Sequence, residues 1–293
     1  MVGHSVHGTG QLQRADRFLQ LHKMGSPLIL ANVWDAGSAH VVAAAGASAI
    51  ATSSGAVSWA HGVQDGSHLD LDTVRMALRE IVSTVGGLPV TADIEGGYAE
   101  TAEGVGASVA AVIDAGVVGI NLEDSGAPAN SSTAPLYTAA DQAARIAAAR
   151  DAAQRAGIRL FINVRTDVYL FGVGAEAGRY DDVVARAQAY SAAGADGLFV
   201  PGLLDLDILS RISQATDLAL NAMWLPRAPS PAEFFKAGVR RVSVGTALFQ
   251  STYTYAQRAA ARLFNEGSYA DLADALSFGE LNDAFRAKSQ NGE

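Results

Sequence analysis

Short apolar runs and longer amphipathic segments alternate along most of the chain. Apolar, β-branched runs predict buried strands, and apolar positions at helical spacing predict the helices between them. The predicted strands span 28–34, 49–53, the apolar run within 88–97, 119–123, 159–164, 197–200, 218–223 and 241–244. The predicted helices span 11–24, 38–45, 71–85, 101–115, 138–156, 180–193, 205–215, 231–237, 255–266 and 269–288.

Eight strand–helix steps of this kind are typical of an α/β fold, and they favour a (β/α)₈ TIM barrel over an open doubly wound sheet. We therefore predict that residues 11–250 form one barrel and that residues 1–10 are disordered. Residues 251–293 are predicted to form C-terminal helices used in oligomerisation. The helix at 269–288 is more than a barrel needs, so we expect it to pack on a neighbouring subunit.

Acidic side chains follow two of the predicted strands, at the end where a (β/α)₈ barrel carries its chemistry. The strand predicted within 88–97 ends in Asp93 and Glu95, two residues apart, so both carboxylates are expected to point to the same side. Glu123 ends the next predicted strand in the same fashion. Like charges held together repel unless a cation or a shared proton lies between them, so a divalent metal is the simplest explanation. The alternative is that Glu95 and Asp124 are turn or helix-start acids.

The composition narrows the classes of partner. Lys and Arg number 21 against 30 for Asp and Glu, giving a formal charge of −9 without any basic cluster, so we expect no nucleic-acid partner. There is no cysteine, which excludes disulfides and thiolate ligands. No apolar run reaches membrane-spanning length and the start lacks a signal-like segment, so we expect no membrane partner and a cytoplasmic location. A small anionic substrate would have to be met locally by a metal or by one or two arginines.

Two predicted loops are longer than the usual βα connection of about 2–6 residues. One covers 55–70 and contains His61, and the other covers 125–137 and is rich in Ser, Ala and Pro. Long loops in a compact domain suggest a lid or a binding loop. A plain mobile loop is the alternative for 125–137, and a solvent-facing or structural histidine is the alternative for His61.

Several motifs, in register from about Pro27 to Phe249, together resemble the isocitrate lyase/phosphoenolpyruvate mutase superfamily. They occupy residues 32–39, 53–55, 62–65, 92–98, 122–124 and 163–167. The resemblance implies a barrel enzyme dependent on Mg²⁺, with Mn²⁺ as an alternative ion. It also implies action on a small 2-oxo or 2-hydroxy acid or diacid through an enolate held on the metal. Members are usually tetramers that exchange their last helix, so a homotetramer or homodimer with a swapped 269–288 helix is expected.

The resemblance also assigns residues to the metal. Asp93 would lie closest to it, and Glu95, Glu123 and Asp65 would hold it directly or through waters. Members commonly carry Asp at the position of Glu95, so the ion or a water is expected to shift slightly here.

For the substrate, the resemblance implies that Ser54 and the Gly55 amide bind the carboxylate, with Arg165 opposite. Trp34, in the first motif, and Asn221, at the end of the seventh predicted strand, are further candidate substrate-binding residues. A guanidinium is a planar, permanently charged fork for a carboxylate. The alternative for Arg165 is an ion pair with a neighbouring acid inside the barrel.

Departures from the family pattern mark the chain as a divergent member. The lyase branches carry a Lys-x-Cys-Gly-His motif after strand four whose Cys is a general acid, and segment 125–137 has no Lys, Cys or His. The mutase and phosphonopyruvate hydrolase branches have Lys directly after the Glu-Asp pair, where this chain has Ser125. A migrating phosphoryl group needs nearby positive charge to stabilise it. The missing lysine therefore makes mutase or phosphonopyruvate hydrolase activity less favoured.

The leading hypothesis is therefore a Mg²⁺-dependent lyase or decarboxylase that cleaves a C–C bond. Arg165 is the candidate for charge stabilisation, and Tyr137, Ser131 and His61 are the candidates for proton transfer. The alternatives are a phosphonopyruvate-type C–P hydrolase or mutase, and a non-catalytic protein that binds 2-oxo acids.

Overall fold

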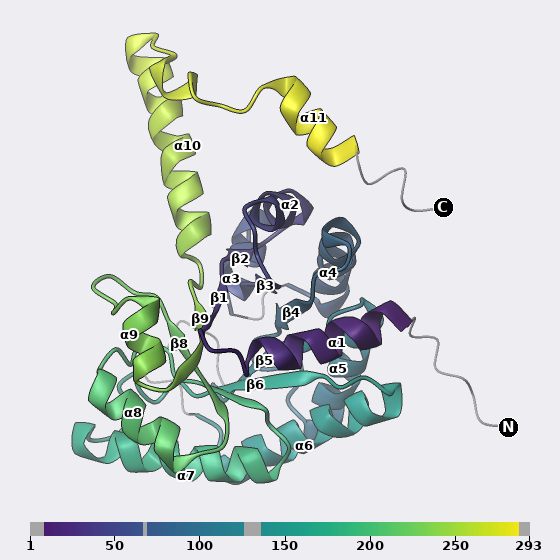
Figure 1. Ribbon diagram of the computed structural model, residues 1–293, viewed down its shortest axis with the longest axis vertical. Helices are drawn as coiled ribbons and strands as arrows, with labels where there is room; N and C mark the ends of the chain where they lie inside the picture. Colours follow the sequence, from purple (N-terminus) through teal and green to yellow (C-terminus); the bar gives the residue numbers. More distant parts are fainter. Residues whose placement is uncertain (1–8, 67–68, 126–135, 287–293) are drawn as a thin grey trace, which may run out of the picture. The chain divides into compact units, whose positions relative to one another are not determined.

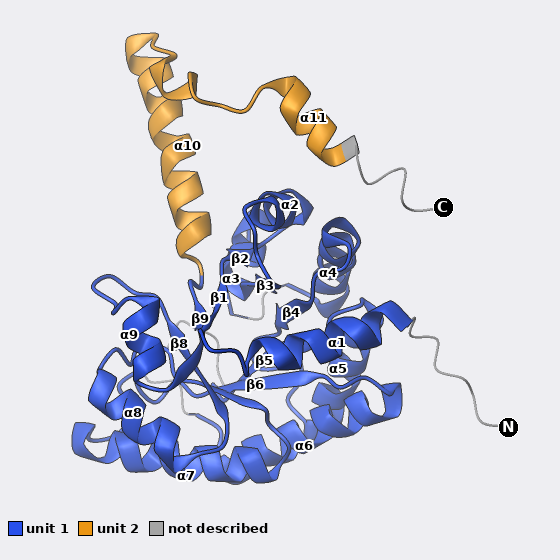
Figure 2. Ribbon diagram, viewed as in Figure 1, with its two compact units in different colours: residues 1–245 blue, residues 246–293 orange. Residues whose placement is uncertain are grey.

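The computed structural model describes residues 9–66, 69–125 and 136–286. The chain divides into two compact units, residues 1–245 and residues 246–293, shown in blue and orange in Figure 2. Among the described residues, none of the helices combines the length and the apolar character that crossing a bilayer requires.

The strands of unit 1 are parallel and form one sheet in the order β1-β9-β8-β7-β6-β5-β4-β3-β2 (Figure 1). The two end strands, β1 and β2, are separated only by Ala31, so the sheet closes on itself. This confirms the predicted α/β barrel, with its first strand broken in two. The strands are β1 (Leu28–Leu30), β2 (Asn32–Val33), β3 (Ile50–Thr52), β4 (Val90–Asp93), β5 (Gly119–Glu123), β6 (Phe161–Arg165), β7 (Gly197–Phe199), β8 (Ala219–Met223) and β9 (Val239–Ser243).

Helices separate the strands along the chain, as the alternation predicts, and several begin at capping residues. Asp35 and Ser38 form a capping box at the start of α2, and Asp70 caps α4 by accepting from the Thr73 amide. The helices of unit 1 are α1 (Thr9–Leu21), α2 (Ala36–Ala44), α3 (Ser54–Ala60), α4 (Leu71–Val85), α5 (Ala102–Asp114), α6 (Ala139–Ala156), α7 (Arg179–Ala192), α8 (Leu206–Ala215) and α9 (Pro231–Lys236), with a 3₁₀ turn at Glu176–Gly178.

Inside the barrel, a polar layer takes the place of the branched apolar side chains that usually fill one. Asn163 Nδ2 donates to Oδ1 of Asn121 at 2.9 Å and of Asn221 at 3.0 Å. Arg241, which is fully buried, donates to the same Asn121 oxygen at 3.0 Å. The hydrogen bonds tie β5, β6, β8 and β9 together beneath the carboxyl ends of the strands.

Helix α1 packs against the opposite end of the barrel. The His22 ring, just beyond α1, stacks on Phe161 at the start of β6 with 3.8 Å between ring centroids, and Phe18 meets both rings edge-on. Burial and the charge of Arg241 lower the pKa of His22 to about 3, so this ring is neutral at pH 7. Aromatic packing therefore fills this end, and the opposite end is left for the site.

Two sequence-based predictions of local structure were wrong. The segment 55–70 is not a loop throughout, because its first part is the helix α3, on which Val57 is buried. The helix predicted at 269–288 is a 3₁₀ turn followed by a separate helix, α11 (Phe278–Arg286). Ser277 and Glu280 exchange side-chain and backbone hydrogen bonds and so fix the start of α11. Residues 287–288 lie outside the described residues.

Unit 2 consists of α10 (Ala247–Glu266), the 3₁₀ turn Ala270–Leu272 and α11. Only Phe249 and Ala259 of α10 are buried. Phe264 is 83% exposed and Phe278 is 85% exposed. Large apolar side chains of unit 2 are therefore exposed in the single chain.

Candidate active site

A cavity of about 540 Å³ opens at the carboxyl ends of β3 to β6. Six of the residues predicted from the sequence line it: Ser54, Asp65, Glu95, Glu123, Tyr137 and Arg165. They lie at or beyond the ends of four strands, β3 to β6, and the barrel is what brings them together. The other lining residues are Gly66, Leu69, Asp70, Leu71, Gly96, Tyr98, Ala99, Glu100, Ser125 and Phe171.

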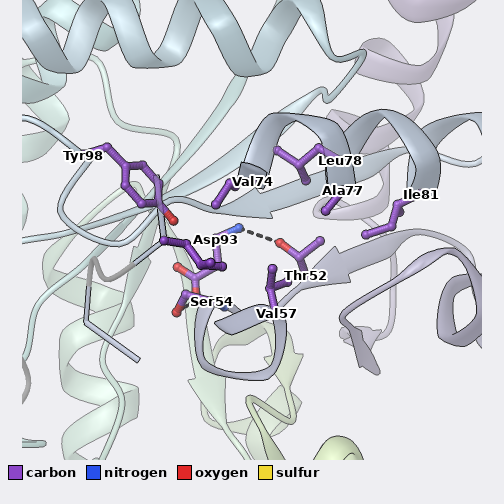
Figure 3. Close-up of a pocket in the computed structure, with 10 residues that line it drawn as sticks. Thr52, Ser54, Val57, Val74, Ala77, Leu78, Ile81, Asp93 and Tyr98 are labelled. Atoms are coloured by element: carbon purple, nitrogen blue, oxygen red, sulfur yellow. Dashed lines mark hydrogen bonds between the residues drawn. The ribbon is translucent and has the colours of Figure 1, made fainter. Parts of the chain in front are cut away.

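Asp93 ends β4 and is held by the turn that follows β3. Its Oδ2 accepts from the Ser54 amide at 3.1 Å and from Ser54 Oγ at 2.9 Å, and its own amide donates to Thr52 Oγ1 at 3.0 Å (Figure 3). Asp93 does not itself line the 540 Å³ cavity. With Ser54 and Tyr98 it lines a smaller, apolar cavity of about 10 Å³, room for about one water. Gly55 is buried in the first turn of α3, next to this carboxylate contact.

Glu95 is not part of the strand, which corrects the alternation argument. Strand β4 ends at Asp93, and Glu95 lies in a turn with a φ of +50°, followed by Tyr98 with a φ of +54°. A non-glycine residue in this left-handed region costs about 1–3 kcal/mol and is found most often at functional sites. The Tyr98 hydroxyl donates to Glu95 Oε1 at 3.1 Å. Glu95 is therefore a turn acid, as the alternative reading held, and it still faces the cavity.

Arg145 of α6 clamps this turn from behind. Its guanidinium donates to the carbonyl of Gly96, to that of Ala99 at 3.1 Å and to that of Glu100 at 2.9 Å. The same group lies over the Tyr137 ring, 4.2 Å from its centroid. Arg145 is 3% exposed, so it links the turn to the cavity wall from within the protein. Nothing in the local pattern of the helix distinguishes this arginine, and sequence reasoning missed it.

Across the cavity, Arg165 is paired on two sides. Its Nη1 lies 2.9 Å from Glu123 Oε2 and its Nε lies 2.6 Å from Asp167 Oδ1, while the Ser125 hydroxyl donates to the other Asp167 oxygen. Burial and the carboxylates of Asp167 and Asp93 raise the pKa of Glu123 to about 8, although Arg165 opposes the shift. Arg165 thus forms the ion pair that was the alternative reading, and it also lines the cavity.

Asp124, next to Glu123, is fully buried and anchors the wall from behind. It accepts from the Asp167 amide at 3.0 Å, from the Tyr190 hydroxyl at 2.8 Å and from Arg186 Nη1 at 3.1 Å. Arg186 also donates to the Tyr137 carbonyl at 2.9 Å, and the Tyr137 amide donates to the Asp124 carbonyl at 2.8 Å. Tyr137 is therefore fixed through both of its backbone groups. Sequence reasoning did not find this network, because its members lie far apart along the chain.

The acids on the β3–β4 side fit a hard divalent cation. Asp65 Oδ1 is buried without a hydrogen-bond partner in the part of the chain that the structure describes, and burial together with Asp93 raises the pKa of Asp65. Within the described ranges, no three acidic or histidine side chains are already grouped as a complete metal site. Mg²⁺ keeps several waters and takes one or two protein carboxylates, so it does not need such a group.

The remaining candidates lie away from the cavity or outside the described residues. His61 is exposed at the C-terminal end of α3, and Asn221 belongs to the polar layer inside the barrel. Trp34 is buried after β2, where its amide donates to Ser38 Oγ at 3.0 Å. None of these three lines the 540 Å³ cavity. Ser131 lies outside the described residues.

Comparison with known proteins supplies independent evidence for the family to which the chain belongs. A protein-family model described as phosphoenolpyruvate phosphomutase matches residues 18–264. An uncharacterized protein of Mycobacterium tuberculosis (strain ATCC 25618 / H37Rv) is 33% identical over 264 residues, which cover 90% of this chain and 94% of that protein. The 2-methylisocitrate lyase of Escherichia coli (strain K12) is 28% identical over 281 residues, covering 93% of this chain and 90% of that enzyme.

Solved structures agree with the barrel. A crystal structure of a phosphonomutase candidate from Burkholderia cenocepacia J2315 superposes with a TM-score of 0.78 and 42% sequence identity. It covers 88% of this chain and 100% of that one.

Proposed function

The chain belongs to the phosphoenolpyruvate mutase/isocitrate lyase superfamily, and from that premise we propose that it is a Mg²⁺-dependent lyase or decarboxylase. It would cleave a C–C bond in a small 2-oxo or 2-hydroxy acid or diacid. Proteins similar to this chain include a 2-methylisocitrate lyase and oxaloacetate decarboxylases, which are named for reactions of this kind.

One observation carries the proposal. Acids from the β3–β4 side and the guanidinium of Arg165 from the β6 side face one cavity. Such a cavity can hold a cation on one wall and a permanent positive charge on the other, so negative charge that develops between them is stabilised. Electrostatic stabilisation of this kind is typically the largest single contribution to catalysis.

Each residue then has a distinct task. Asp93 and Asp65, with Glu95 and Glu123 next to them, would hold the ion, which supplies positive charge for the oxygen that becomes negative when the bond breaks. Ser54 and the Gly55 amide bind the substrate carboxylate next to the reacting carbon. Arg165 orients the same group from the other wall.

Proton transfer is assigned to Tyr137. Its ring lines the cavity, and its backbone is held by Asp124 and Arg186, so the hydroxyl is presented from a rigid position. It would deliver its proton to the carbon that loses its neighbour. A group that transfers protons must lie within hydrogen-bond reach of the reacting atom, and a cavity-lining side chain meets this condition better than the exposed His61 does.

The second candidate function is C–P chemistry on a phosphonopyruvate-like substrate. The family model and the 42% identical structure favour it. The charge of the site opposes it, because Ser125 stands where the mutase pattern has Lys. Release of inorganic phosphate from phosphonopyruvate, or a shift of its phosphorus resonance, would separate this reaction from C–C cleavage.

We also propose that unit 2 mediates assembly into a homodimer or homotetramer by exchange of its terminal helix. The exposed Phe264 and Phe278 support this, because burying two such side chains stabilises an interface by several kcal/mol. Light scattering on the Phe278→Ser variant tests it, and an unchanged mass would contradict the role of this helix.

The decisive experiment incubates the protein with Mg²⁺ and, separately, oxaloacetate, substituted malates and phosphonopyruvate. We expect release of pyruvate or glyoxylate that stops when the ion is removed with a chelator. Calorimetry with oxalate and Mg²⁺ identifies the non-catalytic alternative, which would bind oxalate but turn over none of these acids. Turnover that survives the chelator would contradict the proposal.

A further inference from the structure

The middle of the barrel contains a charge that the candidate site does not use. Arg241 lies at the centre of β9 and is fully buried. Its Nη2 donates to Asn121 Oδ1 at 3.0 Å, within the polar layer. Its Nε and Nη1 have no hydrogen-bond partner among the described residues. Buried polar groups are normally hydrogen-bonded, so this guanidinium calls for an explanation.

No acid among the described residues neutralises Arg241 by direct contact. Arg165 and Arg186, near β5 and β6, both form ion pairs with acids. Arg241 forms none with any residue that the structure describes. Burial lowers the pKa of Arg241 to about 9, so at pH 7 it still carries its charge. An unpaired charge in the interior is costly, so the acids within reach of its field become important.

Asp93 is an acid whose charge reaches Arg241. Asn121, which accepts the hydrogen bond from Arg241, is the register partner of Asp93 between β4 and β5. Partner residues of neighbouring strands point to the same face of the sheet, so Asp93 and Asn121 share one side. The charge of Asp93 also opposes the lowering of the Arg241 pKa. The two charges therefore interact through the interior of the barrel without contact.

On the side away from the site, Arg241 acts on a neutral group. The His22 ring is stacked on Phe161 there, and burial and the charge of Arg241 lower the pKa of His22 to about 3. The interior has a low effective dielectric constant, so a charge acts over a longer distance there than through water. The charge of Arg241 is therefore available to the acids at the carboxyl ends of the strands.

We propose that Arg241 is the internal counter-charge of the metal site. It stabilises the ionised acids of the β3–β4 side when no divalent ion is bound, and it competes with the ion for them when one arrives. Arg241 touches neither the ion nor the substrate, so it is a positioning residue that acts through the charge of Asp93. This rests on the proposed function and deepens it, because an ion opposed by a fixed cation is held less tightly and exchanges more readily.

The sign of the effect distinguishes this role from a structural one. Removing a group that only supports the fold would weaken ion binding or leave it unchanged. Removing an internal counter-charge strengthens ion binding, because the carboxylates lose their other cation and the ion loses a neighbour of like charge.

The test measures the affinity of the full chain for Mn²⁺ by electron paramagnetic resonance at pH 7. Arg241→Gln removes the charge and keeps an amide that can donate to Asn121, and we expect it to bind Mn²⁺ at least about tenfold more tightly than the wild type. Arg241→Lys keeps the charge and loses the planar fork, so its affinity should stay within about threefold of the wild type.

Arg240→Gln is the matched control, because it removes the same charge from the preceding position of β9. Arg240 is half-buried, and its guanidinium lies over the Phe235 ring of α9, 4.9 Å from the centroid. Water and salt screen a charge in such a position, so the Mn²⁺ affinity should change by less than about twofold. Equal tightening in Arg240→Gln and Arg241→Gln would reveal an effect of net charge alone and would overturn the inference.

Thermal unfolding followed by circular dichroism gives a second measurement. Tighter binding to the folded chain increases the stabilisation that the ion provides. Saturating Mn²⁺ should therefore raise the melting temperature of Arg241→Gln more than that of the wild type. An Arg241→Gln chain that is folded only with the ion also supports the inference. One that stays unfolded at saturating Mn²⁺ overturns it, since Arg241 would then be needed by the fold itself.

The remaining outcomes separate the inference from the function beneath it. If the wild type binds Mn²⁺ and Arg241→Gln binds it no more tightly, the inference is wrong and the proposed function stands. If Arg241→Lys tightens binding as much as Arg241→Gln does, the lost fork and not the lost charge is responsible, and the inference is again wrong. If the wild type does not bind Mn²⁺, the ion site is wrong and both proposals fail together.

Discussion

The two walls of the cavity hold their acids in different ways. On the β5–β6 wall, Glu123 and Asp167 are both paired with Arg165, and Asp124 behind them is paired with Arg186. On the β3–β4 wall, Asp93 is held by the amide and hydroxyl of Ser54. Among the described residues, no lysine or arginine forms an ion pair with Asp93 or Asp65 on that wall.

This difference distinguishes acids that hold the structure of the site from acids that are available to bind a ligand. A buried acid that is already neutralised by arginine fixes the position of its neighbours, but it has little charge left for a ligand. An acid held only by neutral donors keeps its charge and can bind a cation. The β5–β6 wall is therefore mainly a rigid support, and the β3–β4 wall would supply the acids closest to the ion, with Glu123 contributing from the other wall.

The largest expected effect tests the β3–β4 wall. Asp93→Ala should lower turnover of whichever acid the protein accepts by about 10³-fold, because removal of an ion ligand and its charge costs about 4 kcal/mol of transition-state stabilisation. Mn²⁺ binding followed by electron paramagnetic resonance should weaken in parallel. Asp72→Ala, at an exposed ion pair of α4, serves as the control and should change neither quantity. More than a tenth of wild-type turnover in Asp93→Ala would contradict the assignment.

The second effect tests the β5–β6 wall as a support. Asp124→Asn removes the buried charged partner of Arg186 and leaves it only the partly exposed Asp182, and breaking a buried pair costs about 3–5 kcal/mol of the free energy of unfolding. Urea denaturation monitored by circular dichroism measures it. Asp182→Asn removes the other partner of Arg186, whose side chain is 42% exposed, and should cost less than about 1 kcal/mol. If the two variants lost the same free energy of unfolding, the buried pair of Asp124 with Arg186 would contribute no more than the exposed one, which would contradict this prediction.

The smallest effect tests the clamp that joins the two walls. Arg145→Lys replaces a fork that reaches three carbonyls by a single ammonium group, so the strained turn that carries Glu95 can relax. We expect kcat/KM to fall about tenfold, or about 1.4 kcal/mol, with weaker Mn²⁺ binding.

Arg150→Lys provides a matched control for the clamp. Arg150 lies on the same helix and also donates to backbone carbonyls, those of Leu160 and Gly194, away from the cavity. Both variants should lose similar stability, and only Arg145→Lys should change metal binding. An equal effect of both on kcat/KM would show that Arg145 acts through general stability alone.

Sequence reasoning reached the barrel and placed several candidate site residues at one end of it, because both depend on local patterns. Apolar runs alternating with amphipathic segments specify the strands and helices, and the polar residues at the strand ends then fall at one end of the barrel. Asp93, Glu123 and Arg165 were found in this way. The same reasoning failed at Glu95, where a two-residue alternation was extended past the point at which the backbone turns to positive φ.

What the sequence by itself determined is the kind of molecule: an α/β barrel of this superfamily, with carboxylates and an arginine at the ends of its strands. Only the tertiary structure decided which of those charged side chains are already paired with an opposite charge inside the protein. Glu123 and Arg165 meet because β5 and β6 pair in that register, and Asp124 meets Arg186 across 62 residues because α7 packs behind the sheet. Strand register and helix packing depend on contacts between distant segments, and charge compensation follows from those contacts, so a local pattern cannot reveal it.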